Sequence, residues 1–476
     1  MDHKKDDFKL RRESLWNSLS DSDKKEMETL VTHYKRYLDE AKTEREAVRT
    51  TEAMALERGF IPLDELEKKY QGSDTSPAGE RFYVKNKEKN ILLGIMGTAP
   101  LTQGFSLIAS HVDSPRLDLK PNPLIEKEKF TLLKTHYYGG MKKYQFASIP
   151  LALHGVVYMQ DGKRLRFSIG EDEDDPVFTV NDILIHLAKQ VQYERKTPDV
   201  IKGEELNILF SSIPYPGDDT KEAVKRYALA LLNERYGLTE EDFVSAEIEA
   251  VPAGRARDVG IDRSMIGAYG QDDRICAFTS VQALFELEQA PAQTALVLLA
   301  DKEEIGSEGS TSMQSSFFSW IVARLLALSG EYRDLSMLNA FMNARALSAD
   351  VAGGINPNFP DVHEHNNAPR LGYGIALTKY TGKSGKYNAN DANAEYVSHI
   401  RSIFNAAGVR WQAAELGKVD EGGGGTVAKF LSKLGIETID SGPPVLSMHS
   451  SFEVSSKVDL LTAKRAYKAF LEWKKT

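Results

Sequence analysis

The feature that most constrains the fold is a run of aliphatic residues, Leu296–Ala300, followed by Asp301-Lys302-Glu303-Glu304-Ile305-Gly306. A short apolar run bounded by turn residues predicts a buried strand. In open α/β sheets, ligands bind where the strands end. Two adjacent glutamates at such an end can divide the chemistry, one binding a metal ion and the other acting as a general base. The alternative is an acidic loop that only caps a strand.

Other predicted strand ends decide between these two interpretations. His111 follows a predicted strand at Phe105–Ala109, Asp350 follows Ala344–Ser348, His449 follows a late strand near Met448, and Asp272 precedes a helical stretch. With Glu304, these side chains suit a pair of zinc ions that share a bridging carboxylate and a bridging water. Asp113 is placed to orient the imidazole of His111. Each residue alone has an ordinary structural explanation, so their joint occurrence favours the metal site.

The chain divides into segments of different character, and 476 residues are too many for one typical domain. The first sixty residues predict helices that begin with capping boxes at Ser20 and Thr43. Residues 120–255 contain a hairpin signal at Asp161-Gly162 and predict a smaller α+β domain. From Ala277 onward, strands and helices alternate. We therefore predict an α/β catalytic domain formed by residues 1–119 and 256–476, with a mixed, mostly parallel sheet flanked by helices, interrupted by an inserted domain at 120–255.

Composition excludes several classes of partner. The 60 basic and 69 acidic residues give a net charge of −9, which does not favour binding to nucleic acid or to an anionic membrane. No apolar stretch has the length of a membrane span or of a signal-peptide core. The single cysteine, Cys276, fits a reducing compartment, so we expect a cytoplasmic protein. We interpret Cys276 as a small buried apolar residue and not as a metal ligand.

These motifs together resemble the M18 family of metallo-aminopeptidases, which includes aspartyl aminopeptidase and its bacterial relatives. The resemblance covers almost the whole chain. It is carried by Ser110-His111-Val112-Asp113-Ser114-Pro115, Asp272-Asp273, Asp301-Lys302-Glu303-Glu304-Ile305-Gly306-Ser307, Ser348-Ala349-Asp350, Asn356-Pro357-Asn358 and Met448-His449-Ser450.

The resemblance implies a dizinc exopeptidase-like fold and assigns the metal ligands. One ion would be held by His111 and Asp350, the other by Glu304 and His449, and Asp272 would bridge them. Glu303 would then be the general base that acts on a metal-bridging water. Zinc is the expected metal, with cobalt or manganese as alternatives. The resemblance also implies that the inserted domain mediates dimerisation and that the chain forms homo-dodecamers built from dimers.

The substrate side of the site departs from the aspartyl branch of the family. Here Ala352 is followed by Gly353 where that branch has an Ala-His pair, and Asn366 is followed by Asn367 where it has Asn-His. Strict specificity for acidic residues is therefore not expected, although Lys142, Lys143 or Lys379 is available to pair with an acidic side chain. We assign His363, Lys379 and Asn366 to substrate binding, and His363 to stabilisation of the oxyanion.

The expected activity is removal of the N-terminal residue from peptide substrates. One alternative is the same dimetal centre acting as a carboxypeptidase or as an N-acyl amino acid deacylase. Another is a non-catalytic shell or assembly protein that has kept the fold. A complete ligand set with Glu303 beside it argues against the scaffold, because a scaffold needs no general base.

Overall fold

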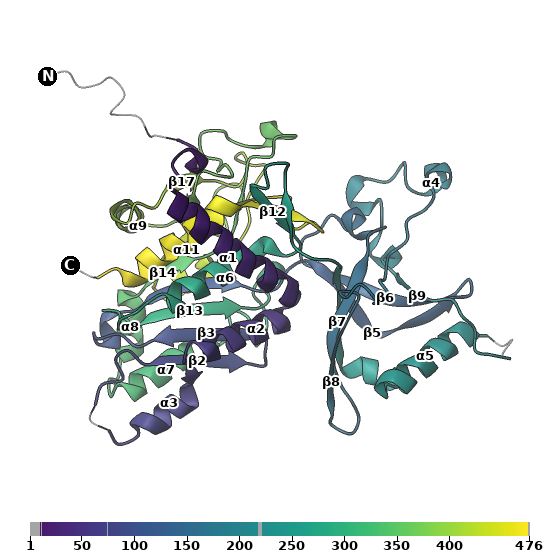
Figure 1. Cartoon of the computed structure of the whole chain (residues 1–476), viewed down its shortest axis with the longest axis horizontal. Coiled ribbons are helices and arrows are strands. Elements are labelled where there is room, and N and C mark those ends of the chain that lie inside the picture. Colours follow the sequence, from purple (N-terminus) through teal and green to yellow (C-terminus); the bar gives the residue numbers. More distant parts are fainter. Residues whose placement is uncertain (1–9, 11, 74, 218–220, 475–476) are drawn as a thin grey trace.

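The computed structural model describes residues 10, 12–73, 75–217 and 221–474. Its largest element is a nine-stranded sheet (Figure 1) in which the four central strands run parallel and both flanks contain antiparallel pairs. The predicted α/β class with a mixed sheet is confirmed. In spatial order the strands are β1 (Ile61–Pro62), β2 (Arg81–Asn86), β3 (Asn90–Ile95), β13 (Ala295–Ala300), β4 (Ser106–His111), β14 (Arg345–Ser348), β18 (Glu437–Gly442), β16 (Ile375–Thr378) and β17 (Trp411–Ala414).

Helices cover both faces of this sheet because its central strands are apolar on both sides. In β13, Ala295, Val297 and Leu299 pack into one core, whereas Leu296 and Leu298 pack into the other. This alternation follows from the two-residue period of a strand. The first core is covered by α1 (Asp21–Glu40), α2 (Glu44–Glu57), α6 (Gln271–Phe285), α9 (Ala394–Ala406) and α11 (Lys457–Glu472). The second is covered by α3 (Leu63–Tyr70), α7 (Phe317–Leu328), α8 (Ser336–Asn343) and α10 (Ala428–Lys433).

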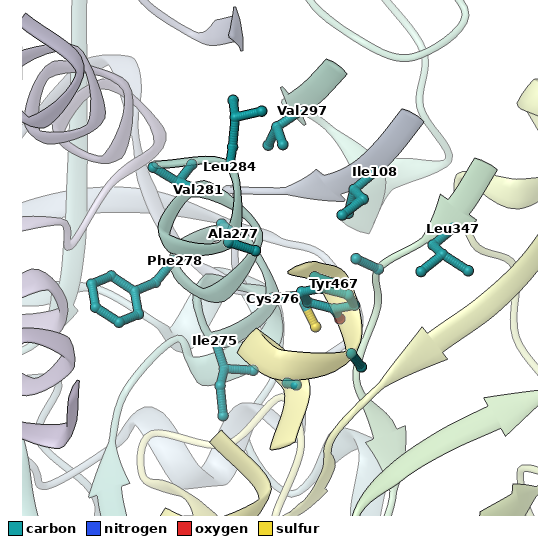
Figure 2. Packing of buried hydrophobic residues seen from close by; sticks show 14 of the residues in the cluster. Ile108, Ile275, Cys276, Ala277, Phe278, Val281, Leu284, Val297, Leu347 and Tyr467 are labelled. Atoms are coloured by element: carbon teal, nitrogen blue, oxygen red, sulfur yellow. The ribbon is translucent and has the colours of Figure 1, made fainter. Parts of the chain in front are cut away.

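Helix α6 is anchored at the centre of the first core. Figure 2 shows Ile108, Val297 and Leu347, from three neighbouring strands, pointing toward this helix. Cys276 is fully buried in the same cluster near Tyr467, in agreement with its interpretation as a buried apolar residue. Burying a large aliphatic side chain contributes about 1.5–3 kcal/mol. The helix therefore has a fixed position, and so does Asp272 in its first turn.

The predicted helix starts near the N-terminus are present. The Oγ of Ser20 accepts a hydrogen bond from the backbone N–H of Asp23, and Thr43 accepts one from Glu46. In each case the acidic side chain accepts in return from the capping residue's N–H, which completes a capping box. These contacts define the starts of α1 and α2.

A second, six-stranded antiparallel sheet extends to one side of the main body (Figure 1). Its strands, in spatial order, are β8 (Arg164–Ile169), β7 (Leu151–Tyr158), β10 (Ala246–Pro252), β5 (Arg116–Lys127), β6 (Phe130–Tyr138) and β9 (Ile208–Ser211). Helices α4 (Ile185–Val191) and α5 (Ala223–Tyr236) accompany it, and it has an apolar core of its own. The proposed boundary between residues 119 and 120 falls inside β5, and the division into domains remains a prediction.

A third, small sheet pairs strands near the C-terminal end of the chain with strands from earlier segments. It consists of β11 (Arg257–Val259), β12 (Met265–Ala268), β20 (Glu453–Ser456), β19 (Pro444–Leu446) and β15 (Ala352–Gly353). The strand predicted before His449 corresponds to β19 and belongs to this sheet. The main sheet instead receives β18, which the sequence analysis did not identify. His449 therefore approaches the site from the turn between β19 and β20.

Candidate metal centre

The parallel central strands bring three chain segments to one edge of the main sheet. His111 is the last residue of β4 and lies opposite Ala300, the last residue of β13. Glu303 and Glu304 follow β13 in a short 3-10 turn, and Asp350 follows β14, the other neighbour of β4. Parallel strands end at the same edge, so residues far apart in sequence become neighbours.

Five acidic and histidine side chains form two groups that share one member. The possible ligand atoms of His111, Asp272 and Asp350 all lie within 4.8 Å of one another, and so do those of Asp272, Glu304 and His449. One oxygen of Asp272 is 3.1 Å from Nε2 of His111, and its other oxygen is 3.1 Å from Nε2 of His449. The Asp272 carboxylate thus points one oxygen toward each group.

Contacts at the other ring nitrogen orient both histidines. Nδ1 of His449 donates to the carbonyl of Gly140 at 2.7 Å. Nδ1 of His111 is 3.0 Å from the carbonyl of Asp113 and 3.4 Å from its carboxylate. A proton held at Nδ1 leaves the Nε2 lone pair free to bind a metal ion. Both Nε2 atoms are the ones that face Asp272.

Asp113 also organises the acidic turn after β13. Its two carboxylate oxygens accept hydrogen bonds from the backbone N–H groups of Glu303 and Glu304, both at 3.1 Å. The hydroxyl of Tyr138 donates to the same carboxylate at 2.9 Å. Asp113 is completely buried, so these contacts are not exchanged for water. It therefore fixes the turn that carries two site residues as well as the His111 ring.

Glu453 has a positioning role that the sequence analysis missed. This buried carboxylate accepts hydrogen bonds from the backbone N–H groups of Asp272, at 3.0 Å, and His449, at 2.8 Å. It therefore connects two members of the ligand groups whose positions in the sequence are far apart. The only signal in the sequence is a carboxylate opening a short strand four residues after His449, and that signal identifies no partner.

The six-stranded antiparallel sheet reaches into the site at two points. Tyr138, which donates to Asp113, is the last residue of β6, and Gly140 follows it by two positions. A Cβ atom added to Gly140 would lie 3.6 Å from Nδ1 of His449, an ordinary van der Waals distance. Residues from the region 120–255 therefore contact both an orienting carboxylate and one of the histidines.

The concentration of buried carboxylates makes the site a good place for cations. Burial and neighbouring carboxylates raise the pKa of Glu304 and Asp350 well above the usual range, and that of Glu303 to about 7. One oxygen each of Asp272 and Glu304 is buried without a hydrogen-bond partner. Carboxylates in this situation are stabilised as anions by a positive charge nearby. Nitrogen and oxygen donors in this combination fit zinc.

The three predicted substrate residues stand outside the two ligand groups. His363 is buried, and its Nε2 accepts a hydrogen bond from the backbone N–H of Asn356, while its Nδ1 has no partner among the described residues. The ammonium group of Lys379 is 3.6 Å from the carboxylate of Asp391. Asn366 is exposed, and its carbonyl accepts a hydrogen bond from Arg12. Their assignment to substrate binding remains a prediction.

Comparison with known proteins gives matches over almost the whole chain. Residues 37–471 match the family described as Aminopeptidase I zinc metalloprotease (M18). The chain is 47% identical over 463 residues to a probable M18 family aminopeptidase 1 from Borrelia garinii, covering 97% of this chain and 99% of that protein. A crystal structure of an M18 family aminopeptidase from Thermotoga maritima is 45% identical, with a TM-score of 0.92, and covers 98% of this chain and 100% of that one. A structure of the mApe1 dodecamer from Saccharomyces cerevisiae, 19% identical and covering 94% of this chain and 97% of that one, has a TM-score of 0.73 and shares the fold.

Proposed function

The chain belongs to the M18 family of zinc aminopeptidases, and on that premise we propose how its residues carry out the hydrolysis. The centre would hold two zinc ions, the first at His111 and Asp350 and the second at Glu304 and His449, with Asp272 between them. The single observation that carries this proposal is the position of Asp272, which belongs to both groups of possible ligand atoms. Cobalt or manganese could replace zinc at such donors.

When bound, the two ions would supply positive charge that makes water more acidic and polarises the scissile carbonyl. Glu303 is the proposed general base. It is adjacent to Glu304 but belongs to neither ligand group, and the bond from its N–H to Asp113 holds it in place. Its carboxylate accepts a proton as the water oxygen bonds to the carbonyl carbon. It then returns that proton to the amine nitrogen as the carbon–nitrogen bond breaks.

The proposed substrates are peptides with a free N-terminus. The carboxylates of the site give the free α-amine a negative environment, which favours cleavage after the first residue. His363, Lys379 and Asn366 are proposed to contact the substrate, with His363 stabilising the oxyanion. Support for His363 is its buried Nδ1, which has no partner among the described residues.

Glu303→Gln tests this assignment, with Glu308→Gln on the exposed part of the same loop as its control. Removing the base should lower kcat roughly 10²- to 10⁴-fold and leave the zinc content unchanged. Zinc content is measured on the same sample as hydrolysis of an aminoacyl amide. Near-normal turnover by a metal-loaded Glu303→Gln protein would exclude the proposed base. Comparing free, N-acetylated and C-terminal substrates separates an aminopeptidase from a deacylase or a carboxypeptidase.

Self-association is supported by an apolar surface at helix α4, within the proposed inserted domain. Leu184, Ile185, Leu187 and Tyr193, in and beside α4, expose 59%, 65%, 56% and 61% of their area. A group of exposed large apolar side chains marks an interaction surface. We propose that this α4 face pairs with the same face of a second copy, which gives the inserted domain its dimerisation role.

A second apolar face supports an assembly larger than a dimer. Leu335, Leu338 and Met342, in and beside α8, are exposed by 66%, 55% and 66%. Helices α4 and α8 lie toward opposite ends of the long axis (Figure 1). A twofold dimer occupies one face, so a second face can join dimers into a closed assembly. The dodecamer described for S. cerevisiae mApe1 gives the number to test.

Light scattering on paired variants tests both faces. The double change Ile185→Asp and Leu187→Asp should stop assembly at one interface, and Leu338→Asp with Met342→Asp should stop it at the other. Leu56→Asp, at the exposed end of α2, is the matched control. A wild-type-sized assembly in both double variants would exclude these faces.

No helix among the described residues has the length and apolar character needed to cross a membrane. We propose a cytoplasmic location, supported by the one cysteine, which is free and buried. Cell fractionation with antibody detection tests it, and recovery in an extracellular fraction would contradict it.

A further inference from the structure

A cavity at the edge of the main sheet carries an unusual concentration of arginine. Its volume is about 260 Å³, and it lies beside β17, α9 and the segment that precedes α1. Four arginines are among the residues that line it, Arg12, Arg370, Arg401 and Arg410. We call this cavity the arginine pocket. None of its lining residues belongs to the ligand groups of the metal centre.

The positive charge of the arginine pocket is not neutralised by the part of the chain that the structure describes. Glu13 is the only carboxylate among the described lining residues, so the pocket has a formal charge of +3 on a chain of −9. Within the described residues, Arg370, Arg401 and Arg410 form no ion pair. Some other arginines are paired with carboxylates, as Arg324 is with Asp64 and Glu67, whereas Arg274 donates to hydroxyl and carbonyl groups instead. Grouped like charges repel one another, and an anion would relieve that repulsion.

The guanidinium group of Arg401 is held in place without the help of a carboxylate. It lies 5.2 Å from the centre of the Trp411 ring, within cation–π range. Trp411 is itself fixed, because its Nε1–H donates to Oδ1 of Asn405 at 2.9 Å. The N–H groups of Arg401 therefore remain available for a ligand while the orientation of the side chain is restricted.

The type of side chain and the volume define the ligand. Arginine binds phosphate through two parallel N–H···O bonds, which lysine cannot do. A volume of about 260 Å³ is smaller than typical pockets for drug-sized ligands, which begin at roughly 300 Å³. We propose that the arginine pocket is a binding site for a small diphosphate-type anion, distinct from the metal centre.

Calorimetric titration of pyrophosphate into the zinc-loaded full chain, in a phosphate-free buffer of low ionic strength, tests this proposal. Arg401→Ala and Arg410→Ala should each weaken binding roughly 10- to 100-fold, as expected when charge-assisted hydrogen bonds are lost. Arg401→Lys should recover part of the affinity, because it keeps the charge and loses the two-pronged geometry. Arg263→Ala, an exposed arginine that pairs with Asp258, is the control and should bind like wild type.

Pyrophosphate can also bind zinc. The arginine variants distinguish binding at the arginine pocket from binding at the metal centre. Binding at the metal centre would be the same in wild type, Arg401→Ala and Arg410→Ala, and that result would overturn the proposal. Absence of binding to the wild-type chain at millimolar pyrophosphate would overturn it as well. Titration with ADP identifies the source of the diphosphate: tighter binding than pyrophosphate indicates a nucleotide, and weaker binding indicates a free polyphosphate. In either case the affinity must depend on Arg401 and Arg410.

Discussion

Replacing Glu453 by glutamine should weaken the proposed zinc site without removing any ligand. Glu453 accepts hydrogen bonds from the backbone N–H groups of Asp272 and His449, at 3.0 and 2.8 Å, and is 1% exposed. The amide of glutamine has one acceptor oxygen, so it can keep one of these bonds. Its NH₂ group faces the other N–H, and two donors repel each other.

The magnitude follows from those two bonds. Burial and the neighbouring Asp272 raise the pKa of Glu453 to about 8, so the comparison is made above that pH, where this carboxyl is ionised. A hydrogen bond to a charged group contributes about 1.5–3 kcal/mol, and leaving a buried N–H without a partner costs about 1–3 kcal/mol. Losing one bond should therefore lower the free energy of unfolding of the zinc-free protein by about 2 kcal/mol. Residues that position metal ligands typically change metal affinity by about 10- to 100-fold when replaced. The same loss of zinc affinity is expected here.

Two measurements check this prediction. Urea denaturation of the zinc-free protein gives the change in unfolding free energy, and competition with a chelator gives zinc affinity. Glu234→Gln, on the exposed surface of α5, is the matched control. If Glu453→Gln unfolded at the wild-type urea concentration and bound zinc within twofold of wild type, the positioning role of Glu453 would be refuted.

Three further predictions concern charge in and around the site. Although burial opposes it, Glu171 and Glu46 raise the pKa of His154 to about 9. The contribution of His154 to the free energy of unfolding, about 3 kcal/mol, should therefore be complete below pH 6.5 and lost as pH rises through 9. Urea denaturation of wild type and His154→Gln across this pH range checks this prediction. Zinc removal should lower Tm, since Glu304 and Asp350 lose their compensating charge, and zinc at about 1,000 times its Kd should restore about 4 kcal/mol, measured by calorimetry; an unchanged Tm would contradict this. Asp113→Asn should lower kcat about 10- to 100-fold in a folded protein, and wild-type kcat at full zinc content would exclude its orienting role.

Most of the fold could be predicted because local patterns specify it. The aliphatic run at Leu296–Ala300 became β13, and the hairpin signal at Asp161-Gly162 connects β7 to β8, which pair from Tyr158 and Arg164. Boundaries moved by one or two residues, as with the strand predicted at Phe105–Ala109 and found at Ser106–His111. The sheet to which each late strand belongs was harder to predict. Whether β18 or β19 joins the main sheet depends on pairing with distant strands, which no local pattern records.

The residues of the candidate metal centre could be predicted to the same extent and for the same reason. His111, Glu304 and Asp350 lie at ends of strands that sequence periodicity reveals, and parallel strands end together. Glu453 was missed because its partners are backbone N–H groups, and every residue except proline has one. The arginine pocket was missed because its members come from four separate segments and follow no spacing.

The hydrogen bond from His449 to the carbonyl of Gly140 has a consequence for anyone who redesigns this chain. Cutting out residues 120–255 to obtain a minimal enzyme would delete that carbonyl and the Tyr138 hydroxyl together, and leave His449 free to turn. The excised enzyme would then bind the proposed second ion poorly, even with all five proposed ligands still encoded. A foreign domain inserted in its place would have to supply an acceptor for His449 and a donor for Asp113, whatever its own fold.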